Sequence, residues 1–479
     1  MPHVHLIGIG GSGMSGLAGL FVQAGWSVTG CDKAAVHPPA ADTLAALGIH
    51  PFLGYSPDHL DPSPDLVVVG NVVRATNEED REALTRGMPR THMAKALWDH
   101  FLSRRTSVVV AGTHGKTTST SMLAYLLQRG GYDPGFFVGG VVRGLGTGYQ
   151  LGSGAYFVTE GDEYDCAWFD KTPKFLHYRP RYLLVTNVEY DHADIYADLD
   201  AIREVFRRLI ASLPHDGVLV YCAESPILTE LAREAPCTVV SYAVDSPMPA
   251  TWTASNIRVE AGGTAFTLTR GVEPAGEFLI RLPGRHNVLN ATGVIALWRA
   301  MGLSWSGLAD RISEFQGAAR RMQVLARGDA VVLDDFAHHP TEVRATLSAA
   351  RQWWPGRKMW AVFEPKTQTS RRQVLQADLA EALSLADEVV VIEPHDLESI
   401  PLDHRMDVAR LADDVRARGV RTTVAATQEE TAALLVEELT RETIVVLMSA
   451  GSLGHVADAV TSLVATKGWG SAPDSTRSG

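Results

Sequence analysis

Cysteine is scarce in this chain, and its four copies, Cys31, Cys166, Cys222 and Cys237, form no Cys-x-x-Cys pair. A disulfide framework is therefore not expected, and a reducing cytoplasm is the simplest setting for the protein. Cys166 lies beside an acidic motif, but a small apolar filler is its favoured role.

Long apolar runs and an excess of positive charge are also missing. No run approaches the length of a transmembrane helix, and the N-terminus lacks the basic and apolar regions of a signal peptide. The net charge of −12 argues against a general surface for nucleic acid or anionic membrane, although it does not exclude local basic pockets for phosphates. We therefore expect small-molecule substrates, with neither nucleic acid nor a membrane as partner.

Length and composition predict a globular protein of several domains. At 479 residues the chain has room for about three of them. The motif pattern places these domains at residues 1–105, 106–318 and 319–465. Residues 466–479 are rich in Gly, Ser, Asp and Arg and are predicted to form a disordered tail. We expect a monomer or a weak homodimer.

The first segment alternates short apolar strands with helical stretches. The expected strands and helices are Val4–Ile9, Met14–Ala24, Ser27–Thr29, Ala41–Leu47 and Leu66–Val69. This alternation is typical of a parallel sheet with helices packed on it.

A glycine-rich turn follows the first expected strand, in H-L-I-G-I-G-G-S-G-M-S-G. Gly8, Gly10 and Gly13 have the G-x-G-x-x-G spacing, and Asp32 follows at the end of the second strand, where it could bind a ribose hydroxyl. The obvious ligand is NAD, but any nucleotide diphosphate would suit such a loop. A tight turn that packs a helix on a strand is the alternative. The ligand is favoured because the glycines and Asp32 occur together.

The most informative segment is V-V-V-A-G-T-H-G-K-T-T, residues 108–118. A β-branched run ends in a glycine loop, and a helix is expected over Ser119–Gln128. Backbone N–H groups at such a turn can bind a phosphate chain, while Lys116 reaches the outer phosphates and Thr117 binds Mg²⁺. Val110 stands where the usual eight-residue pattern has its first glycine. The flanking strand and helix nevertheless favour a phosphate loop over chance.

Two acidic motifs follow apolar runs in the middle segment, and a β-rich excursion is expected from Cys237 to Leu282. The motif side chains are Glu160, Asp162, Glu163 and Asp165 in E-G-D-E-Y-D, and Asn187, Glu189, Asp191, His192 and Asp194 in N-V-E-Y-D-H-A-D. The carboxyl ends of neighbouring parallel strands share one crevice, so both motifs should face the phosphate loop. Their oxygens suit Mg²⁺, although either motif alone would be read as a solvated loop.

The last segment again alternates strands and helices. The expected strands are Val331–Leu333, Met359–Phe363, Glu388–Ile392 and Thr443–Met448. His338 and His339 follow the first of them, and a metal shared by these adjacent residues is improbable, so one of them is expected to cap or orient a neighbour. Lys366, Arg371 and Arg372 form a basic patch that could bind a carboxylate, with a solvated face as an equal competitor.

Two phosphate-binding loops on two α/β domains suggest two phosphorylated ligands. One chemistry fits both: ATP phosphorylates a carboxylate on a nucleotide-linked substrate, and an amine then displaces the phosphate. Domain closure would exclude water from the acyl phosphate. The competing hypotheses are an NAD-dependent dehydrogenase, disfavoured by the phosphate loop, and a regulatory nucleotide-binding protein without catalysis.

Taken together, the motifs resemble those of the Mur ligase family, the ATP-dependent amide ligases of peptidoglycan assembly. The resemblance rests on G-I-G-G-S-G-M-S-G, A-G-T-H-G-K-T-T, E-G-D-E-Y-D, N-V-E-Y-D-H-A-D, G-R-H-N-V-L-N-A and D-D-F-A-H-H-P. It implies a Rossmann-like N-terminal domain, a central P-loop ATPase-type domain with a mostly parallel sheet, and a Rossmann-like C-terminal ligase domain. It also implies a cytoplasmic enzyme that uses ATP and Mg²⁺.

The resemblance also assigns residues. ATP is expected to contact Gly112, Thr113, His114, Gly115, Lys116, Thr117, Thr118, Asn290, Arg321 and Asp335. Thr117 and Glu160 would hold one Mg²⁺ and His192 a second, and Lys116, Glu160 and His192 would be catalytic. The UDP of UDP-N-acetylmuramate, rather than NAD, is expected at Gly8, Gly10, Gly11, Ser12, Gly13, Met14, Asp32 and Asn71.

Two branches of the family take UDP-N-acetylmuramate itself. One adds L-alanine, and the other adds the recycled tripeptide L-alanyl-γ-D-glutamyl-meso-diaminopimelate. The chain is more similar to the second branch in the insertion F-D-K…K-F-x-H-Y, and it has P-K-T-Q-T-S-R-R where the first usually has P-H-R-Y-T-R-T. Lys366 and Arg371 would then bind the peptide, although Lys366 replaces an arginine common in that branch. Gly161 in place of alanine should matter little, and both branches lack the lysine that other branches carry after Asp191.

Overall fold

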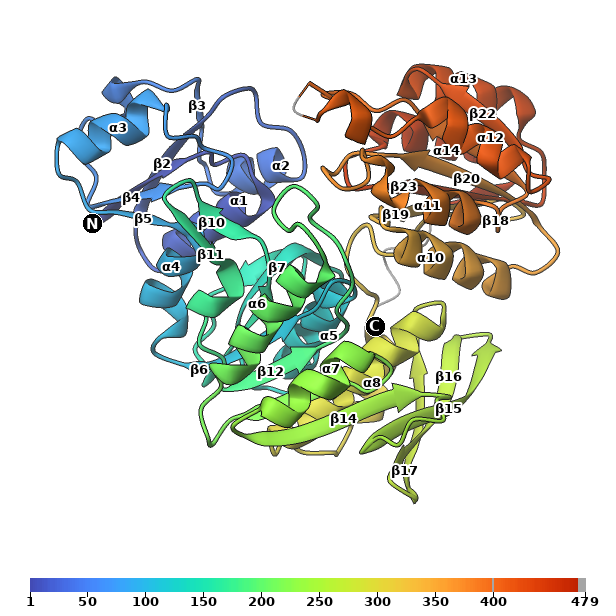
Figure 1. Cartoon of the computed structure of the whole chain (residues 1–479), viewed down its shortest axis with the longest axis horizontal. Helices are drawn as coiled ribbons and strands as arrows, with labels where there is room; N and C mark the ends of the chain where they lie inside the picture. The colour runs from blue at the N-terminus through green and yellow to red at the C-terminus, as the bar shows by residue number, and fades with distance from the viewer. Residues whose placement is uncertain (399, 473–479) are drawn as a thin grey trace.

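A computed structural model describes residues 1–398 and 400–472. The chain forms three α/β domains, which lie at the upper left (N-terminal), in the lower part (central) and at the upper right (C-terminal) of Figure 1. The predicted fold class is thereby confirmed. None of the helices in the described residues is both long and apolar enough to cross a membrane.

The N-terminal domain is a parallel sheet in the order β3-β2-β1-β4-β5. The strands are β1 (His3–Ile7), β2 (Ser27–Asp32), β3 (Phe52–Leu53), β4 (Leu66–Val69) and β5 (Arg90–His92). The helices are α1 (Ser12–Gln23), α2 (Ala40–Ala46), α3 (Glu78–Thr85) and α4 (Met93–Leu97). The sheet grows outward from β1 in both directions, and such a switch point opens a crevice beyond the carboxyl ends of the strands. The glycine-rich turn lies there, between β1 and α1.

The central domain is built on a ten-stranded sheet in the order β17-β16-β15-β14-β13-β12-β6-β9-β7-β8. The strands are β6 (Thr106–Ala111), β7 (Gly135–Val142), β8 (Thr147–Gln150), β9 (Tyr156–Gly161), β12 (Tyr182–Val185), β13 (Val218–Cys222), β14 (Thr238–Val244), β15 (Trp252–Glu260), β16 (Gly263–Arg270) and β17 (Glu273–Ile280). The helices are α5 (Lys116–Arg129), α6 (Leu199–Ala211), α7 (Pro226–Leu231), α8 (Arg285–Ala300) and α9 (Leu308–Glu314). A separate hairpin is formed by β10 (Asp165–Ala167) and β11 (Asp170–Pro173). The middle of the sheet is parallel, and its two ends are antiparallel. The predicted β-rich excursion is β14 to β17.

The C-terminal domain has the strand order β22-β21-β20-β23-β19-β18-β24. The strands are β18 (Gln323–Gly328), β19 (Val331–Asp335), β20 (Lys358–Glu364), β21 (Glu388–Ile392), β22 (Arg421–Ala425), β23 (Thr443–Ser449) and β24 (Gly470–Ser471). The helices are α10 (Pro340–Trp353), α11 (Gln376–Leu383), α12 (Val408–Arg416), α13 (Gln428–Glu438) and α14 (Gly454–Thr466). All four strands predicted from the sequence are present.

The start of the predicted disordered tail differs from the structure. Thr466 ends α14, the ring of Trp469 packs against the core of the C-terminal domain, and β24 pairs antiparallel with β18. This aromatic anchor, which the Gly- and Ser-rich composition conceals, gives residues 466–472 a place in the fold. The rest of the predicted tail, residues 473–479, lies outside the described residues.

The N-terminal and central domains share one hydrophobic core. It combines buried side chains of β1, α1 and α4 with those of β6, α5 and α8. The ring of Tyr149 in β8 packs so closely on α1 that a Cβ added at Gly19 would lie 2.1 Å from it. The C-terminal domain instead has two cores of its own, one on each face of its sheet.

Candidate functional site

The phosphate loop connects β6 to α5 and depends on two glycines. Gly112 and Gly115 have φ values of 128° and 79°, a region that other residues rarely adopt. A Cβ at Gly112 would lie 2.1 Å from Oγ1 of Thr186, and one at Gly115 would lie 2.5 Å from Oδ1 of Asn290. Asn187, two residues beyond the end of the neighbouring strand β12, fixes the loop because its side-chain oxygen accepts the N–H of His114 at 2.8 Å. The loop is therefore held in one shape before any ligand binds.

The ammonium group of Lys116 is buried among acceptors. It donates to the carbonyl oxygens of Gly112 and Thr113 and lies 3.2 Å from Oε2 of Glu163. Burial disfavours its charge, but Glu163 and Asp162 outweigh burial and raise the pKa of Lys116. A permanent positive charge thus stands at the start of α5, where the helix dipole also favours anions.

Thr117 and Glu160 meet beside this lysine. Oγ1 of Thr117 donates to Glu160 at 2.9 Å, and the other carboxylate oxygen accepts the N–H of Gly139 at 2.6 Å. Arg321 reaches Oγ1 of Thr117 from the C-terminal domain at 3.3 Å. Burial and Asp162 raise the pKa of Glu160, so an added cation would stabilise its charged form. A hydroxyl and a carboxylate are hard oxygen donors and fit Mg²⁺.

His192 is paired with Glu163 rather than with Glu160. Its Nε2 lies 3.2 Å from Oε1 of Glu163, and although burial opposes it, this carboxylate raises the pKa of His192. Its backbone is left-handed, with φ of 54°, and its N–H donates to Asp191 at 2.6 Å. Burial would raise the pKa of Asp191, but His192 and His338 lower it to about 2. The second metal predicted at His192 stays a prediction.

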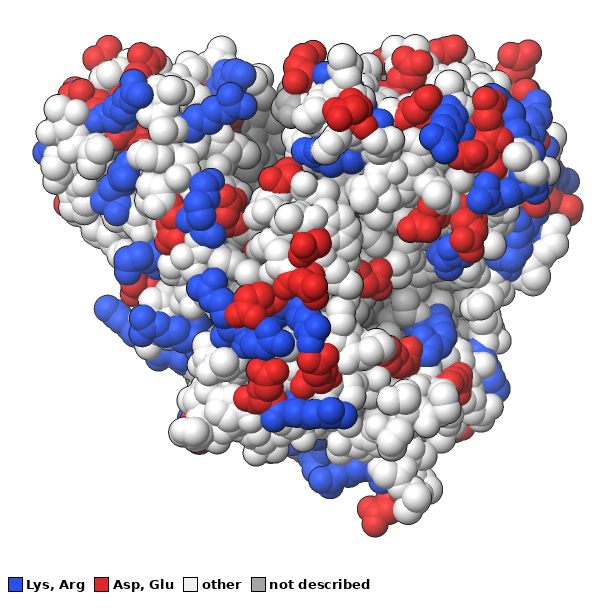
Figure 2. Space-filling view, viewed as in Figure 1, with Lys and Arg blue, Asp and Glu red and all other residues white. Residues whose placement is uncertain are grey.

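A cavity of about 860 Å³ joins the two glycine-rich loops. Its walls come from all three domains, and the surface is hollowed between the N-terminal and C-terminal domains (Figure 2). Of the predicted site residues, it is lined by Gly8, Gly11, Ser12, Gly13, Met14, Asn71, Thr113, Gly115, Lys116, Thr117, Glu160, His192 and Arg321. The structure thus brings the two predicted ligand loops to one space.

Asp32 supports the N-terminal glycine loop from behind. Its carboxylate accepts the N–H groups of Gly10 at 2.8 Å and of Lys33 at 2.7 Å. A Cβ at Gly10 would lie 2.7 Å from the same carboxylate. Within the described residues, neither Asp32 nor Gly10 belongs to the cavity wall. This geometry favours a structural role for Asp32 over the predicted contact with a ribose.

A second cavity, of about 620 Å³, opens on the other side of the phosphate loop. It lies between the central and C-terminal domains, and its walls include His114, Gly115, Thr118, Asn290, Arg321 and Asp335, all predicted to serve ATP. Asp335 accepts the N–H groups of Met322 and Ala337, and burial raises its pKa to about 6. Gly115 and Arg321 border both cavities, so a triphosphate could pass from one to the other.

An ionic network crosses from the central to the C-terminal domain below the phosphate loop. Nδ1 of His114 lies 3.2 Å from Glu342, Nε2 lies 3.5 Å from Glu189, and Thr341 donates to Glu189 at 2.6 Å. Burial would lower the pKa of His114, but the two carboxylates raise it to about 9. His339 caps α10, which confirms that one histidine of the His-His pair has a capping role.

The two residues predicted to bind peptide lie outside both cavity walls, as far as the described residues go. Lys366 is half-exposed, lies 3.4 Å from Glu364 and packs its stem on Gly451, which lines the large cavity. Arg371 is buried, and its guanidinium donates to the carbonyl oxygens of His395 and Asp396. This geometry keeps Lys366 near the site but favours a structural role for Arg371.

Two charged groups of the site went unassigned in the sequence. Glu163 was one carboxylate among several in its motif, and only the structure singles it out as the partner of Lys116 and His192. Glu342 has no motif of its own. Its position three residues into α10, where an acidic side chain can cap the helix, was the available signal.

Comparisons with known proteins agree with this geometry. Three family models match: Mur ligase family, catalytic domain, at residues 3–105; Mur ligase middle domain at 110–298; and Mur ligase, glutamate ligase domain, at 320–451. A protein of Escherichia coli (strain K12) named UDP-N-acetylmuramate–L-alanyl-γ-D-glutamyl-meso-2,6-diaminoheptandioate ligase is 38% identical over 393 residues, which are 82% of this chain and 85% of that protein.

A relative with a different name is almost as similar. A UDP-N-acetylmuramate–L-alanine ligase of Halorhodospira halophila (strain DSM 244 / SL1) is 36% identical over 458 residues, 94% of this chain and 91% of that protein. The crystal structure of a murein peptide ligase from Psychrobacter arcticus 273-4 has a TM-score of 0.74 and 31% identity, covering 97% of this chain and 99% of that one. Because these matches span nearly the whole chain, we conclude that it belongs to the Mur ligase family of ATP-dependent amide ligases.

Proposed function

We propose that this ligase joins the lactyl carboxylate of UDP-N-acetylmuramate to the amine of L-alanyl-γ-D-glutamyl-meso-diaminopimelate, a tripeptide recycled from peptidoglycan. The observation that carries the proposal is the continuous cavity of about 860 Å³. A diphosphate bound at Gly11–Gly13 would direct its sugar toward Lys116 and Glu160. The amine would then enter from the side of the C-terminal domain.

The reaction has two steps. In the first, a carboxylate oxygen of the sugar substrate attacks the γ-phosphorus of ATP, and the bond to the bridging oxygen breaks to leave ADP. In the second, the amine nitrogen attacks the acyl carbon, the bond to the phosphate oxygen breaks, and phosphate and a proton are released.

Lys116 and the phosphate loop would supply most of the electrostatic stabilisation. The first N–H groups of α5 have no partner within the helix and would be available to the phosphates. Lys116, already charged, would exchange its contacts with the carbonyl oxygens of Gly112 and Thr113 for the γ-phosphate. Such preorganised charges stabilise the transition state because they need no reorganisation during the reaction.

Thr117 and Glu160 would hold Mg²⁺, since their adjacent oxygens are the donors that this ion prefers. When bound, the ion would neutralise charge on the transferring phosphate. His192 is the proposed ligand of a second ion. To serve, its Nε2 would have to leave Glu163, to which it is now paired.

Two features favour the tripeptide as acceptor. The loop after β20 has Lys366 and lacks the His-Arg pair with which the alanine branch is expected to grip a single carboxylate. Lys366 also lies against Gly451 at the cavity, where it could meet a more distant carboxylate of a peptide. The alternative acceptor is L-alanine, because relatives named for either reaction have similar identity, 38% and 36%.

An ADP-release assay with UDP-N-acetylmuramate and either acceptor tests the proposal. The tripeptide should support turnover at a much higher kcat/KM than L-alanine. Faster turnover with L-alanine would replace the proposal by its alternative. No turnover with either acceptor would reject both and point to another amine or another nucleotide sugar.

A further inference from the structure

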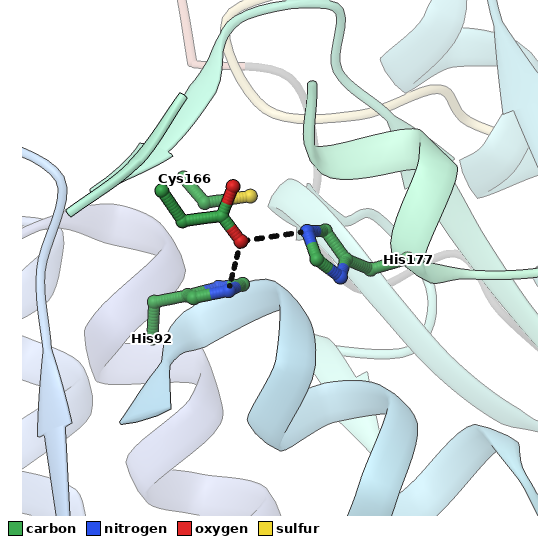
Figure 3. A group of neighbouring side chains, drawn as sticks. His92, Cys166 and His177 are labelled. Atoms are coloured by element: carbon green, nitrogen blue, oxygen red, sulfur yellow. Dashed lines mark hydrogen bonds and ion pairs between the residues drawn. The ribbon is translucent and has the colours of Figure 1, made fainter. Parts of the chain in front are cut away.

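Four side chains with metal-binding atoms meet where the N-terminal domain touches the central domain. His92 ends β5, Cys166 lies in β10, Asp170 lies in β11, and His177 ends the short 3₁₀ helix Lys174–His177. One ligand atom from each lies within 4.8 Å of all the others. Figure 3 shows His92, Cys166 and His177 converging around one carboxylate, that of Asp170.

The two distances from Asp170 to the histidines are close to the edges of a tetrahedral site. Oδ2 of Asp170 lies 3.1 Å from Nε2 of His92 and 3.3 Å from Nε2 of His177. Ligand atoms bound to zinc at its usual bond lengths are about 3.3–3.6 Å apart. The sulfur of Cys166 completes the group, within 4.8 Å of the other three ligand atoms.

The present contacts of these atoms are ones that a metal could replace. Cys166 is 1% exposed and its thiol donates to the carbonyl oxygen of Thr172 at 3.1 Å, while Nε2 of His177 is buried and has Asp170, at 3.3 Å, as its partner. The other carboxylate oxygen of Asp170 accepts the N–H of Thr172 at 2.8 Å, which orients the carboxylate and leaves Oδ2 facing the histidines. Such outer contacts are typical of metal ligands.

A network of hydrogen bonds without metal is the competing explanation, because Asp170 could accept from both histidines. His92 supports it in part: its Nδ1 accepts the N–H of Lys95, which leaves the proton on Nε2. That contact is long, at 3.3 Å, and would be given up when Nε2 binds a metal. That network pairs Nε2 of His177 with Asp170 and the thiol of Cys166 with the carbonyl oxygen of Thr172, so the two explanations are separated by the affinity of the chain for a metal.

We propose that His92, Cys166, Asp170 and His177 form a structural Zn²⁺ site. Two imidazoles, a thiolate and a carboxylate are the donor types and the number that tetrahedral zinc takes. On binding, the thiol of Cys166 loses its proton to solvent and its sulfur bonds to the metal. This assignment of a metal does not depend on which substrates the enzyme takes.

The position of this site indicates its role. The hairpin β10–β11 already docks on the N-terminal domain, because Trp168 and Arg90 both donate to Asp80 at 2.8 Å and Arg90 stacks over Phe169. Zinc would tie the same hairpin to β5 through His92. Since Cys166 also lines the large cavity, the metal would fix part of the wall that receives the sugar substrate.

Titration of the full chain with Co²⁺, in excess Mg²⁺ to fill oxygen sites, tests the proposal. The expected result is one equivalent of cobalt with thiolate-to-cobalt charge-transfer absorption and the d–d bands of tetrahedral cobalt. Zinc should displace it and should raise the Tm of the protein. Absence of charge-transfer absorption in the folded chain would overturn the proposal.

Matched variants locate the thiolate. Cys166→Ser should lose the charge-transfer absorption, whereas Cys222→Ser, equally buried in the same domain, should keep it. Cys31→Ser should also keep it; loss there would assign the metal to the group His5, Cys31 and Glu79 and reject the proposed site. His177→Gln, which keeps the thiol, should weaken cobalt binding about tenfold or more, and unchanged affinity would contradict the proposal.

Discussion

Lys116 offers the sharpest test of the phosphate loop. Lys116→Met keeps most of the side-chain volume and removes the charge. In the wild type the ammonium of Lys116 lies 3.2 Å from Glu163, which is almost fully buried. The substitution should therefore change the stability of the ligand-free protein as well as the rate of the reaction.

The two effects have separate magnitudes. Loss of one preorganised positive charge at a transferring phosphate should lower kcat about 10²–10³-fold. Breaking a buried ion pair costs about 3–5 kcal/mol, but His192 stays 3.2 Å from Glu163 as a second partner, so we expect a loss of about 1–3 kcal/mol in the free energy of unfolding. Although burial opposes it, Lys116 lowers the pKa of Glu163 in the folded chain. The stabilisation of the fold by this ion pair is present at neutral pH and is lost as the pH falls through the lowered pKa of Glu163. The variant and the wild type should therefore differ least in their free energies of unfolding in acid.

A double variant separates the effects. Lys116→Met combined with Glu163→Gln should recover most of the lost stability in urea unfolding, because no buried carboxylate is left with His192 as its single charged partner. ADP release should stay as low as in the single variant. Activity of the single variant within tenfold of the wild type would refute the role of Lys116, and an unstable double variant would refute the pairing argument.

Three further predictions concern other parts of the molecule. The pKa of His114 is raised to about 9, so its pairing with Glu342 stabilises the fold by at most about 3 kcal/mol below about pH 6.5, and this stabilisation is lost as the pH rises through 9. The Tm should therefore fall between pH 6.5 and 9 in the wild type and not in His114→Gln; an equal change of Tm with pH in both proteins would contradict the argument. Gly10→Ala should displace the carboxylate of Asp32, because the new Cβ would lie 2.7 Å from it. Calorimetry should then find the affinity for UDP-N-acetylmuramate about tenfold weaker and the affinity for ATP unchanged; an equal loss of both affinities would mean general unfolding. Lys366→Ala should raise the KM for the peptide severalfold with little effect on the KM for ATP, and a matching rise in both would indicate a structural role.

Much of the framework could be predicted from the sequence because strand period and glycine loops are local signals. The strands Leu66–Val69 and Glu388–Ile392 have the predicted bounds, and α5 begins at Lys116, three residues before the predicted Ser119. The two acidic motifs lie beside the phosphate loop because β9 and β12 flank β6 in a parallel sheet. Topology rules are sufficient for such statements.

What the sequence could not supply are pairings between distant residues. The sequence near Asp32 does not show that its carboxylate accepts the N–H of Gly10. The sequence near Arg371 does not show that its guanidinium donates to carbonyl oxygens of a loop more than twenty residues away. The cluster of His92 with Cys166 is likewise a product of two domains meeting. The ordered structure of residues 466–472 was not predicted, because composition indicates disorder and gives no sign that Trp469 packs on the core.

The core shared by the N-terminal and central domains has a consequence for turnover. These two domains should behave as one rigid body, and the C-terminal domain, with separate cores, should swing against it about the junction of Gly317 and Arg320, whose φ values are 88° and 57°. Such a swing would open the space proposed for ATP, between the moving parts, and leave the distance between the two glycine loops unchanged. Because the C-terminal domain also contributes a wall of the large cavity, nucleotide exchange and release of the joined product would both depend on this one movement.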